Sequence, residues 1–328
     1  MTQEQVEQLM QEADDFLEKE KYTEAMEIYA KVLEEEPTHD EAYAMMGAVY
    51  GEQGDIPMAV QSLKKALEIN PANADAWLTL GIVQEQTGEE SEALESFRNA
   101  SSHAPDDATI HFTLANLQLK KGQTQEALAS YLETIRYNPK HTQAIFTSAN
   151  IFRDAGDFNN AAKGFQAILD IEPENLFALR RLATMLLRLN RLEEAEQILT
   201  PAIQAHPDDA WLHARLATVY AQQGQLDEAL ATIKQALALE PDNDDLEQRH
   251  ADILQKRGDY EEALGILRPM LDREEPLYGA VITFTMFASS LDMKDRAEAL
   301  IEKLKQADEL TGKQEENIAE ALIWLKTH

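Results

Sequence analysis

The sequence predicts an all-α protein built from tandem pairs of helices. Two residue types recur with a period of ~34 residues along most of the chain, which is the length of a repeat made of two helices and their turns. The prolines of this series are Pro37, Pro71, Pro105, Pro139, Pro173, Pro207 and Pro241, and the alanines are Ala25, Ala59, Ala93, Ala127, Ala161, Ala195, Ala229 and Ala263. Because each repeat contacts only its neighbours, such an array forms one solenoid rather than several globular domains.

Apolar spacing places two helices in each repeat. If the proline is position 32 of a repeat, helix A carries apolar or small residues at positions 4, 7, 8 and 11, and helix B carries them at 20, 24, 27 and 28. Both spacings put one stripe along one face of a helix. In the third repeat the stripe of helix A is Trp77, Leu80, Gly81 and Gln84.

Signals for helix ends recur with the same period. A residue that tolerates the left-handed conformation follows helix A at Gly54, Gly88, Gly122, Gly156, Asn190, Gly224 and Gly258. Side chains suited to an N-cap precede helix A at Asn73, Asp107, Asn175, Asp209 and Asn243. We expect repeats over 6–39, 40–73, 74–107, 108–141, 142–175, 176–209, 210–243 and 244–277, with a degenerate ninth over 278–311. Together they make a domain over 1–311, and segment 312–328 is expected to be a capping helix that covers the last repeat.

Composition limits the classes of function. The chain has 328 residues, a formal net charge of −31, 44% hydrophobic residues and no cysteine. Such a charge repels nucleic acid and anionic membranes, and without cysteine there is no disulfide and no thiolate metal site. The N-terminus does not resemble a secretory signal, and the longest uncharged stretch, 276–291, is shorter than a membrane helix. We therefore expect a soluble, cytoplasmic protein that binds neither nucleic acid nor membrane.

The third repeat carries the marks of a known family. Its residues Trp77, Leu80-Gly81, Gly88, Ala93, Phe97, Ala100 and Pro105 resemble the tetratricopeptide-repeat pattern, and the resemblance covers nearly the whole chain. It implies a right-handed superhelix in which helix A lines a concave groove, with positions 2, 5, 9 and 12 facing that groove. The candidate groove residues, at or next to these positions, are Phe112, Asn116, Leu119, Phe146, Asn150, Arg153, Phe177, Arg180, Leu187, Arg188 and Trp211. Aromatic side chains beside arginines and amides are typical of interface hot spots.

Two known groove chemistries were compared with these residues. Asn116 and Asn150 are similar to two rungs of the asparagine ladder in the repeats of O-GlcNAc transferase, where side-chain amides hold a peptide backbone. The alternative is that both are solvated surface amides. The carboxylate clamp of chaperone-binding repeats is not carried over, because only Asn116 and Arg181 match its pattern.

Charge is distributed unevenly along the chain. Residues 1–37 contain twelve acids and three bases, a net of −9, whereas residues 140–191 contain seven bases and five acids, a net of +2. A positive island in a negative protein would attract an acidic partner at repeats five and six. The alternative is that its arginines pair with Glu193, Glu194 or Glu196 on their own helices.

No catalytic motif is present in the sequence. The eight histidines form no metal-ligand spacing, there is no phosphate-binding loop, and His250 occupies core position 7, which favours a packing role. We expect no cofactor and no metal. The predicted function is a non-catalytic scaffold that binds a peptide or protein segment. The alternatives are a self-assembling structural protein and the recruiting subunit of a separate enzyme.

The ninth repeat suggests a second interface. Its first helix, expected over 277–291, carries no charge, and Ile282 and Met286 fall at groove positions 5 and 9. With the capping helix expected beyond helix B, these two side chains would have no cover within the chain and would mark an interaction site. The alternative is that the one-residue shift of Pro276 relative to the period rotates the helix and buries them.

Overall fold

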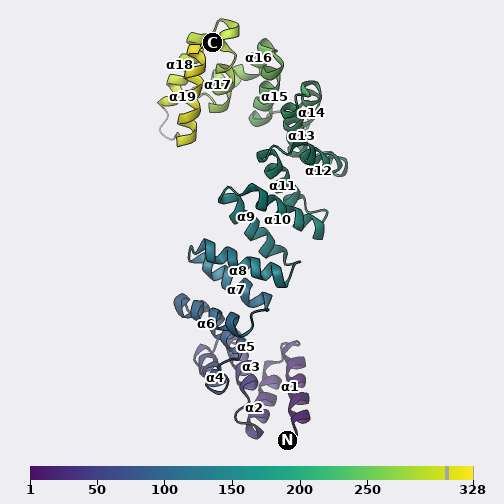
Figure 1. The fold of residues 1–328 in the computed structure, drawn as a ribbon, viewed down its shortest axis with the longest axis vertical. Coiled ribbons are helices and arrows are strands. Elements are labelled where there is room, and N and C mark those ends of the chain that lie inside the picture. Colours follow the sequence, from purple (N-terminus) through teal and green to yellow (C-terminus); the bar gives the residue numbers. More distant parts are fainter. Residues whose placement is uncertain (307–309, 328) are drawn as a thin grey trace. The chain divides into compact units, whose positions relative to one another are not determined.

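Helices joined by short turns make up the chain in a computed structural model, which describes residues 1–306 and 310–327 (Figure 1). The described residues contain no strand. Residues 307–309, in the predicted ninth repeat, and residue 328, at the end of the predicted cap, lie outside the described residues. The helices are α1 (Gln3–Leu17), α2 (Tyr22–Glu35), α3 (Asp40–Glu52), α4 (Ile56–Ile69), α5 (Ala74–Gln86), α6 (Glu90–His103), α7 (Ala108–Lys120), α8 (Thr124–Tyr137), α9 (Thr142–Asp154), α10 (Phe158–Ile171), α11 (Leu176–Arg188), α12 (Leu192–Ala205), α13 (Ala210–Gln223), α14 (Leu226–Leu239), α15 (Asp244–Arg257), α16 (Tyr260–Leu271), α17 (Tyr278–Thr285), the 3₁₀ helix η1 (Ala288–Leu291), α18 (Lys294–Lys305) and α19 (Gly312–Thr327).

The helices group into two compact units, residues 1–173 with α1 to α10 and residues 174–328 with α11 to α19. The prediction of a single domain over 1–311 followed by a cap therefore stays a prediction. Within each unit every A helix packs beside its own B helix, as α7 and α8 do in the first unit and α13 and α14 do in the second (Figure 1). The all-α helical repeat solenoid is confirmed.

Helix boundaries follow the predicted period closely. The A helices α3, α5, α7, α9, α11, α13 and α15 begin at residues 40, 74, 108, 142, 176, 210 and 244, each the expected first residue of a repeat. The five predicted N-cap side chains all accept a hydrogen bond from the first turn; Asn73, for example, accepts from the Ala76 amide at 2.8 Å. His39 and His141 also serve as N-caps, through their Nδ1 atoms, a role that the sequence analysis did not assign.

The turns after helix A require a left-handed residue. The six predicted glycines have φ between 72° and 93°, and Asn190 takes the same role with φ of 54°. A glycine reaches this region without steric cost, and asparagine is among the few other residues that tolerate it. The periodic glycine signal is therefore confirmed as the end of each helix A.

The buried stripe of helix A differs from the predicted one. Positions 7 and 8 are mostly buried as expected, but positions 3 and 10 are buried in every repeat from the second to the eighth. The predicted core positions 4 and 11 vary between repeats: Trp77 and Gln84 are only half-buried, whereas Ile145, Leu186 and Leu254 are buried. Helix A packs between the B helix of its own repeat and that of the repeat before it, so it needs a wider apolar face than one narrow stripe. Gln84, which was assigned to the apolar stripe, instead accepts a hydrogen bond from the Ser96 hydroxyl at 2.7 Å.

Consecutive A helices also touch each other. In the first unit α3 contacts α5, and in the second unit α11 contacts α13, α13 contacts α15, and α15 contacts α17. Within the described residues, consecutive B helices make no comparable contact. The second unit therefore presents a row of neighbouring A helices from α11 to α17, and the first unit has such a contact between α3 and α5.

The first helix of the ninth repeat is shorter than predicted. The expected helix over 277–291 divides into α17, which ends at Thr285, and η1. The break brings Phe284 and Phe287 into the core together, with their rings edge to face at 5.7 Å, and Phe287 stacks on Tyr260 at 5.5 Å. Both phenylalanines are fully buried. Residues 277–291 are apolar on all sides, and one straight helix can turn only part of its surface toward the core. The break between α17 and η1 allows side chains on both sides of it to be buried.

Candidate functional site

In the first unit the candidate groove residues lie on α7 and α9. Phe112 is half-buried, with its ring 4.3 Å from the His141 ring and 5.9 Å from the Tyr131 ring. Phe146 lies edge to face with the buried Phe165 at 6.2 Å. Both aromatic residues therefore contribute to packing as well as to the surface. Leu119 is half-buried at the edge of the cluster that contains Tyr131.

The two asparagines of the predicted ladder hold hydrogen bonds within the unit. Asn116 is exposed, and its Oδ1 accepts a hydrogen bond of 2.6 Å from the Tyr131 hydroxyl. Asn150 is half-buried, donates from Nδ2 to the Phe146 carbonyl at 2.9 Å and accepts at Oδ1 from Arg153 at 2.6 Å. These bonds fix the orientation of both amides, and the Asn116 Nδ2 keeps its donors for a ligand, since no described residue accepts from it. Their proposed likeness to a peptide-binding ladder stays a prediction.

In the second unit the candidate residues lie on α11 and α13. Phe177 is 51% exposed, and the Arg181 guanidinium lies over its ring at 4.8 Å. Leu187 is half-buried, and Arg188 is exposed. Phe177 and Arg181 are positions 2 and 6 of their repeat and are neighbours on one face of α11. An aromatic ring with a guanidinium over it is a surface that suits a peptide ligand.

Trp211 occupies the corresponding place in the next repeat. Two guanidinium groups lie over its ring, that of Arg180 at 5.4 Å and that of Arg215 at 4.9 Å. The Arg180 Nη2 also donates to Asp209 Oδ2 at 2.5 Å, and the same Asp209 caps the first turn of α13 through its other oxygen. Arg180 therefore links two consecutive repeats of this unit.

Arg215 was missed by the sequence analysis. It is half-buried, and none of the ion pairs among the described residues includes it. Burial lowers the pKa of its guanidinium, and the charges of Arg249 and Arg188 lower it further, while Asp245 raises it. The signal that could have identified Arg215 is periodic, because position 6 is arginine in three consecutive repeats, at Arg181, Arg215 and Arg249.

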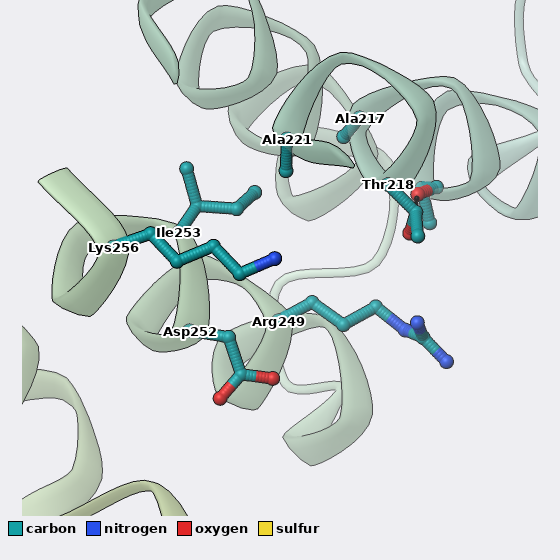
Figure 2. A pocket seen from close by; sticks show the side chains of 8 residues that line it. Ala217, Thr218, Ala221, Arg249, Asp252, Ile253 and Lys256 are labelled. Carbon is teal, nitrogen blue, oxygen red and sulfur yellow. Dashed lines mark hydrogen bonds between the residues drawn. The ribbon is translucent and has the colours of Figure 1, made fainter. Parts of the chain in front are cut away.

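Two adjoining hollows follow this row of arginines along α13 and α15. The larger has a volume of about 300 Å³ and is lined by Trp211, Arg215 and Arg249, among others. The smaller, about 90 Å³, lies where Ala217, Thr218 and Ala221 of α13 face Arg249, Asp252, Ile253 and Lys256 of α15 (Figure 2). Ala214 and Arg249 line both hollows. The two hollows are therefore neighbours on the surface of α13 and α15.

Asp252 brings a half-buried acid to the smaller hollow. Burial raises the pKa of its carboxyl, and the hydrogen bond of 2.5 Å from the Thr283 hydroxyl, together with Arg249 and Lys256, opposes that rise. Figure 2 shows Arg249 and Lys256 on the same face of α15 as Asp252. The hollow therefore offers both a desolvated acid and cationic groups.

Several bases of the predicted positive island already have partners. Arg191 donates to Glu194 at 2.5 Å and 2.6 Å, and Arg153 donates to Asp154 at 2.9 Å. The pairing of Arg191 with its own helix is one of the alternatives considered above. Among the bases of the island, Lys140, Lys163, Arg181 and Arg188 form no ion pair with any described residue.

At the C-terminal end, the two residues of the predicted second interface differ in exposure. Ile282 is half-buried and packs against the cluster that also includes Leu322 of α19, whereas Met286 is 37% exposed. Helix α19 contacts both α17 and α18, so the capping helix does not lie only beyond helix B as was assumed. Ile282 is therefore partly covered within the chain.

Features of catalytic or membrane proteins were also sought. Within residues 1–306 and 310–327, no group of three His, Asp or Glu side chains could hold a metal ion. None of the described helices combines the length and hydrophobicity needed to span a bilayer. His250 is buried, and burial lowers the pKa of its imidazole.

Comparisons with known proteins agree with the repeat architecture. A model described as the C-terminal domain of cilia and flagella-associated protein 70 matches residues 3–209, and a tetratricopeptide-repeat model matches residues 196–247 and 220–283. No curated protein sequence matches this chain.

Three solved structures are similar to this chain to different degrees. The complex of Naa15 and Naa10 bound to HypK-THB is similar with a TM-score of 0.57 at 18% identity, covering 99% of this chain and 55% of that chain. YrrB, described as a TPR protein with an unusual peptide-binding site, has a TM-score of 0.46 at 22% identity, covering 57% of this chain and 97% of that chain. Yeast Tom70 has a TM-score of 0.45 at 14% identity, covering 99% and 95%. Because this chain spans little more than half of the Naa15 complex chain, that likeness concerns the helical array alone.

Proposed function

Because this chain belongs to the tetratricopeptide-repeat family, and within it to the family of the C-terminal domain of cilia and flagella-associated protein 70, we propose that it is a non-catalytic scaffold. Members of the tetratricopeptide-repeat family are generally protein-interaction scaffolds and typically lack catalytic activity. The proposed ligand is a peptide or protein segment that lies along the row of A helices. We place this adaptor function in the cytoplasm, without a cofactor.

One observation carries the proposal: the A helices present aromatic, amide and guanidinium groups that the core does not need. Phe177 is 51% exposed although its neighbour on the helix, Ala178, is fully packed. Asn116 and Arg188 are exposed as well. Aromatic and arginine side chains contribute most of the binding energy in typical interfaces. The part of the island that keeps its charge favours a partner with an acidic segment.

Self-association is the second candidate function, and the C-terminal end supports it. Met286 is 37% exposed and Ile323 of α19 is 63% exposed, so apolar side chains reach the surface on two neighbouring helices. A second copy of the chain could cover them. Light scattering over a range of concentrations separates the two candidates, because only self-association makes the molar mass rise with concentration.

The scaffold proposal predicts that groove variants lose the partner while they keep the fold. Changing Asn150 and Arg180 to alanine together is expected to abolish capture of the partner, because each is a polar side chain on the A helices of its own unit. The melting temperature should change by only a few degrees, since the Arg180 side chain is 42% exposed and an ion pair of a solvent-exposed base contributes about 0–1 kcal/mol. Crosslinking and affinity capture from native lysate, followed by mass spectrometry, measure the first effect, and circular dichroism measures the second.

A matched control is available on the B helices. Gln235 of α14 and Arg268 of α16 are exposed, and their double alanine variant changes similar groups outside the A-helix surface. Capture by this control should equal capture by the unchanged protein. If the Asn150 and Arg180 variant captures its partner equally well, the proposed site is wrong. If its melting temperature collapses, these side chains are structural.

A further inference from the structure

The arginine series at position 6 gives the A-helix surface of the second unit a specific chemistry. Arg181 and Arg215 each lie over the aromatic ring at position 2 of the same helix, Phe177 and Trp211. In the next repeat, position 2 is an acid, Asp245, and its Oδ2 accepts hydrogen bonds of 3.1 Å and 3.3 Å from Arg249. Arg249 thus has a carboxylate partner at position 2 of its helix, whereas Arg181 and Arg215 have an aromatic ring at that position.

Arg215 is the member of the series whose surroundings are least favourable to its charge. It is half-buried, no carboxylate among the described residues lies within ion-pair distance of it, and its cationic neighbours are Arg188 and Arg249. The acid that raises the pKa of Arg215 is Asp245, and Asp245 already forms an ion pair with Arg249. The hollow beside Arg215 is lined by three arginines and three acids. Asp209 pairs with Arg180, Asp245 pairs with Arg249, and Glu240 accepts a hydrogen bond of 2.6 Å from Asn243. Arg215 is therefore the arginine of this lining that has no ion pair among the described residues.

The space beside Arg215 can receive a ligand. The hollow of about 300 Å³ is lined by Trp211, Arg215 and Arg249, and it shares Ala214 and Arg249 with the smaller hollow. The Arg180 Nε, at the other side of Trp211, is buried and has no hydrogen-bond partner among the described residues. A partly desolvated guanidinium beside an aromatic ring binds a carboxylate more strongly than an exposed one does, because water screens the pair less.

We propose that Arg215, together with the ring of Trp211, binds a carboxylate group of a peptide in the hollow between α13 and α15. The peptide carboxylate accepts hydrogen bonds from the Arg215 guanidinium, as the Asp245 carboxylate does from Arg249. An apolar side chain next to it in the peptide lies against the Trp211 ring. This inference rests on the proposed scaffold function and specifies its ligand as an acidic peptide. The carboxylate can come from an aspartate or glutamate side chain or from a peptide C-terminus.

Trp211 fluorescence tests this site directly in a background with Trp77→Phe and Trp324→Phe, which removes the two other tryptophans. Three short synthetic peptides are titrated. The first is an acetylated and amidated hexapeptide of alternating glutamate and leucine. The second replaces its glutamates by glutamines, and the third is the glutamine peptide with a free C-terminal carboxylate. We expect the first peptide to change Trp211 fluorescence saturably and the second not to do so, with weaker binding at high salt.

Arg215→Gln should weaken binding of the glutamate peptide about tenfold or more, because a charge-assisted, partly buried contact is lost. Arg268→Gln is the matched control, since it removes the same charge from an exposed site on α16, and it should leave binding unchanged. Binding of the third peptide with the same dependence on Arg215 would identify a C-terminal carboxylate as a source. Circular dichroism melts of both variants establish that they are folded.

Three results would overturn the proposal. They are equal binding of the glutamine and glutamate peptides, equal affinity of the Arg215→Gln and Arg268→Gln variants, and no binding of either carboxylate peptide. None of these contradicts the scaffold function, which depends on the capture experiment with the Asn150 and Arg180 variant. The opposite combination is also informative. If the Asn150 and Arg180 variant captures its partner as well as the unchanged protein does, while the peptide still binds in a way that depends on Arg215, the carboxylate site is supported and the proposed groove site is wrong.

Discussion

Changing Leu325 to aspartate is expected to unfold the C-terminal end of the second unit. Leu325 of α19 is 2% exposed and belongs to the cluster that extends from α13 to α19. An unpaired carboxylate buried there should cost about 3 kcal/mol or more, since neither water nor a basic side chain compensates it. Denaturant unfolding followed by circular dichroism, with hydrogen exchange to locate the loss, measures the effect.

The control for this prediction lies two residues away. Ile323 is 63% exposed on the same helix, so Ile323→Asp introduces the same charge without burying it. We expect its free energy of unfolding to differ from that of the unchanged protein by less than about 0.5 kcal/mol. Equal stability of the two variants would mean that α19 does not cap the array. A stable Ile323→Asp that no longer forms oligomers would support self-association.

Changing Gly81 to alanine is expected to destabilise the third repeat by about 1–3 kcal/mol. A Cβ atom at Gly81 would lie 2.5 Å from Cε1 and 2.6 Å from Cδ1 of Phe97, which is fully buried and cannot move aside. The prediction is checked by the shift in the midpoint of urea unfolding. Gly265→Ala is the control, because no atom lies within 4 Å of the added Cβ and its φ is not positive. That variant should gain about 0.5–1 kcal/mol from helix propensity. Equal midpoints would refute close helix packing at Gly81.

The sequence predicts the fold well where a signal repeats. Helix A begins at the expected residue in seven consecutive repeats because its N-cap and the proline before it recur together. The ends of these helices at Gly54 through Gly258 are equally clear, since only a few residue types tolerate the left-handed conformation.

The buried face of helix A was less predictable. Alanine at position 3, as at Ala42 and Ala76, is a weak hydrophobic signal, yet both side chains are fully buried. Large aromatic residues such as Trp77 give a strong signal but are half-buried, because the indole nitrogen donates to the Pro71 carbonyl at 2.8 Å. Packing between two B helices, rather than hydrophobicity, decides which positions the core uses.

For the candidate site, periodicity identified the right helices but not every important residue. Phe177 and Trp211 were found because aromatic residues outside the stripe are conspicuous. Arg215 was missed because position 6 was not counted among groove positions, although arginine recurs there in three repeats. Its isolation from carboxylates depends on the pairing of Arg180 with Asp209 and of Arg249 with Asp245, which sequence spacing alone does not reveal.

The central claim, that a partner lies along the row of A helices, is tested most directly by site-specific photocrosslinking. A photoreactive phenylalanine analogue is placed at Asn116 or Phe177 on A helices, and at Leu132 or Lys234, which are exposed on the B helices α8 and α14. The captured partner should crosslink from the first pair of positions and not from the second. Crosslinks from Leu132 and Lys234, with none from Asn116 and Phe177, would contradict the account.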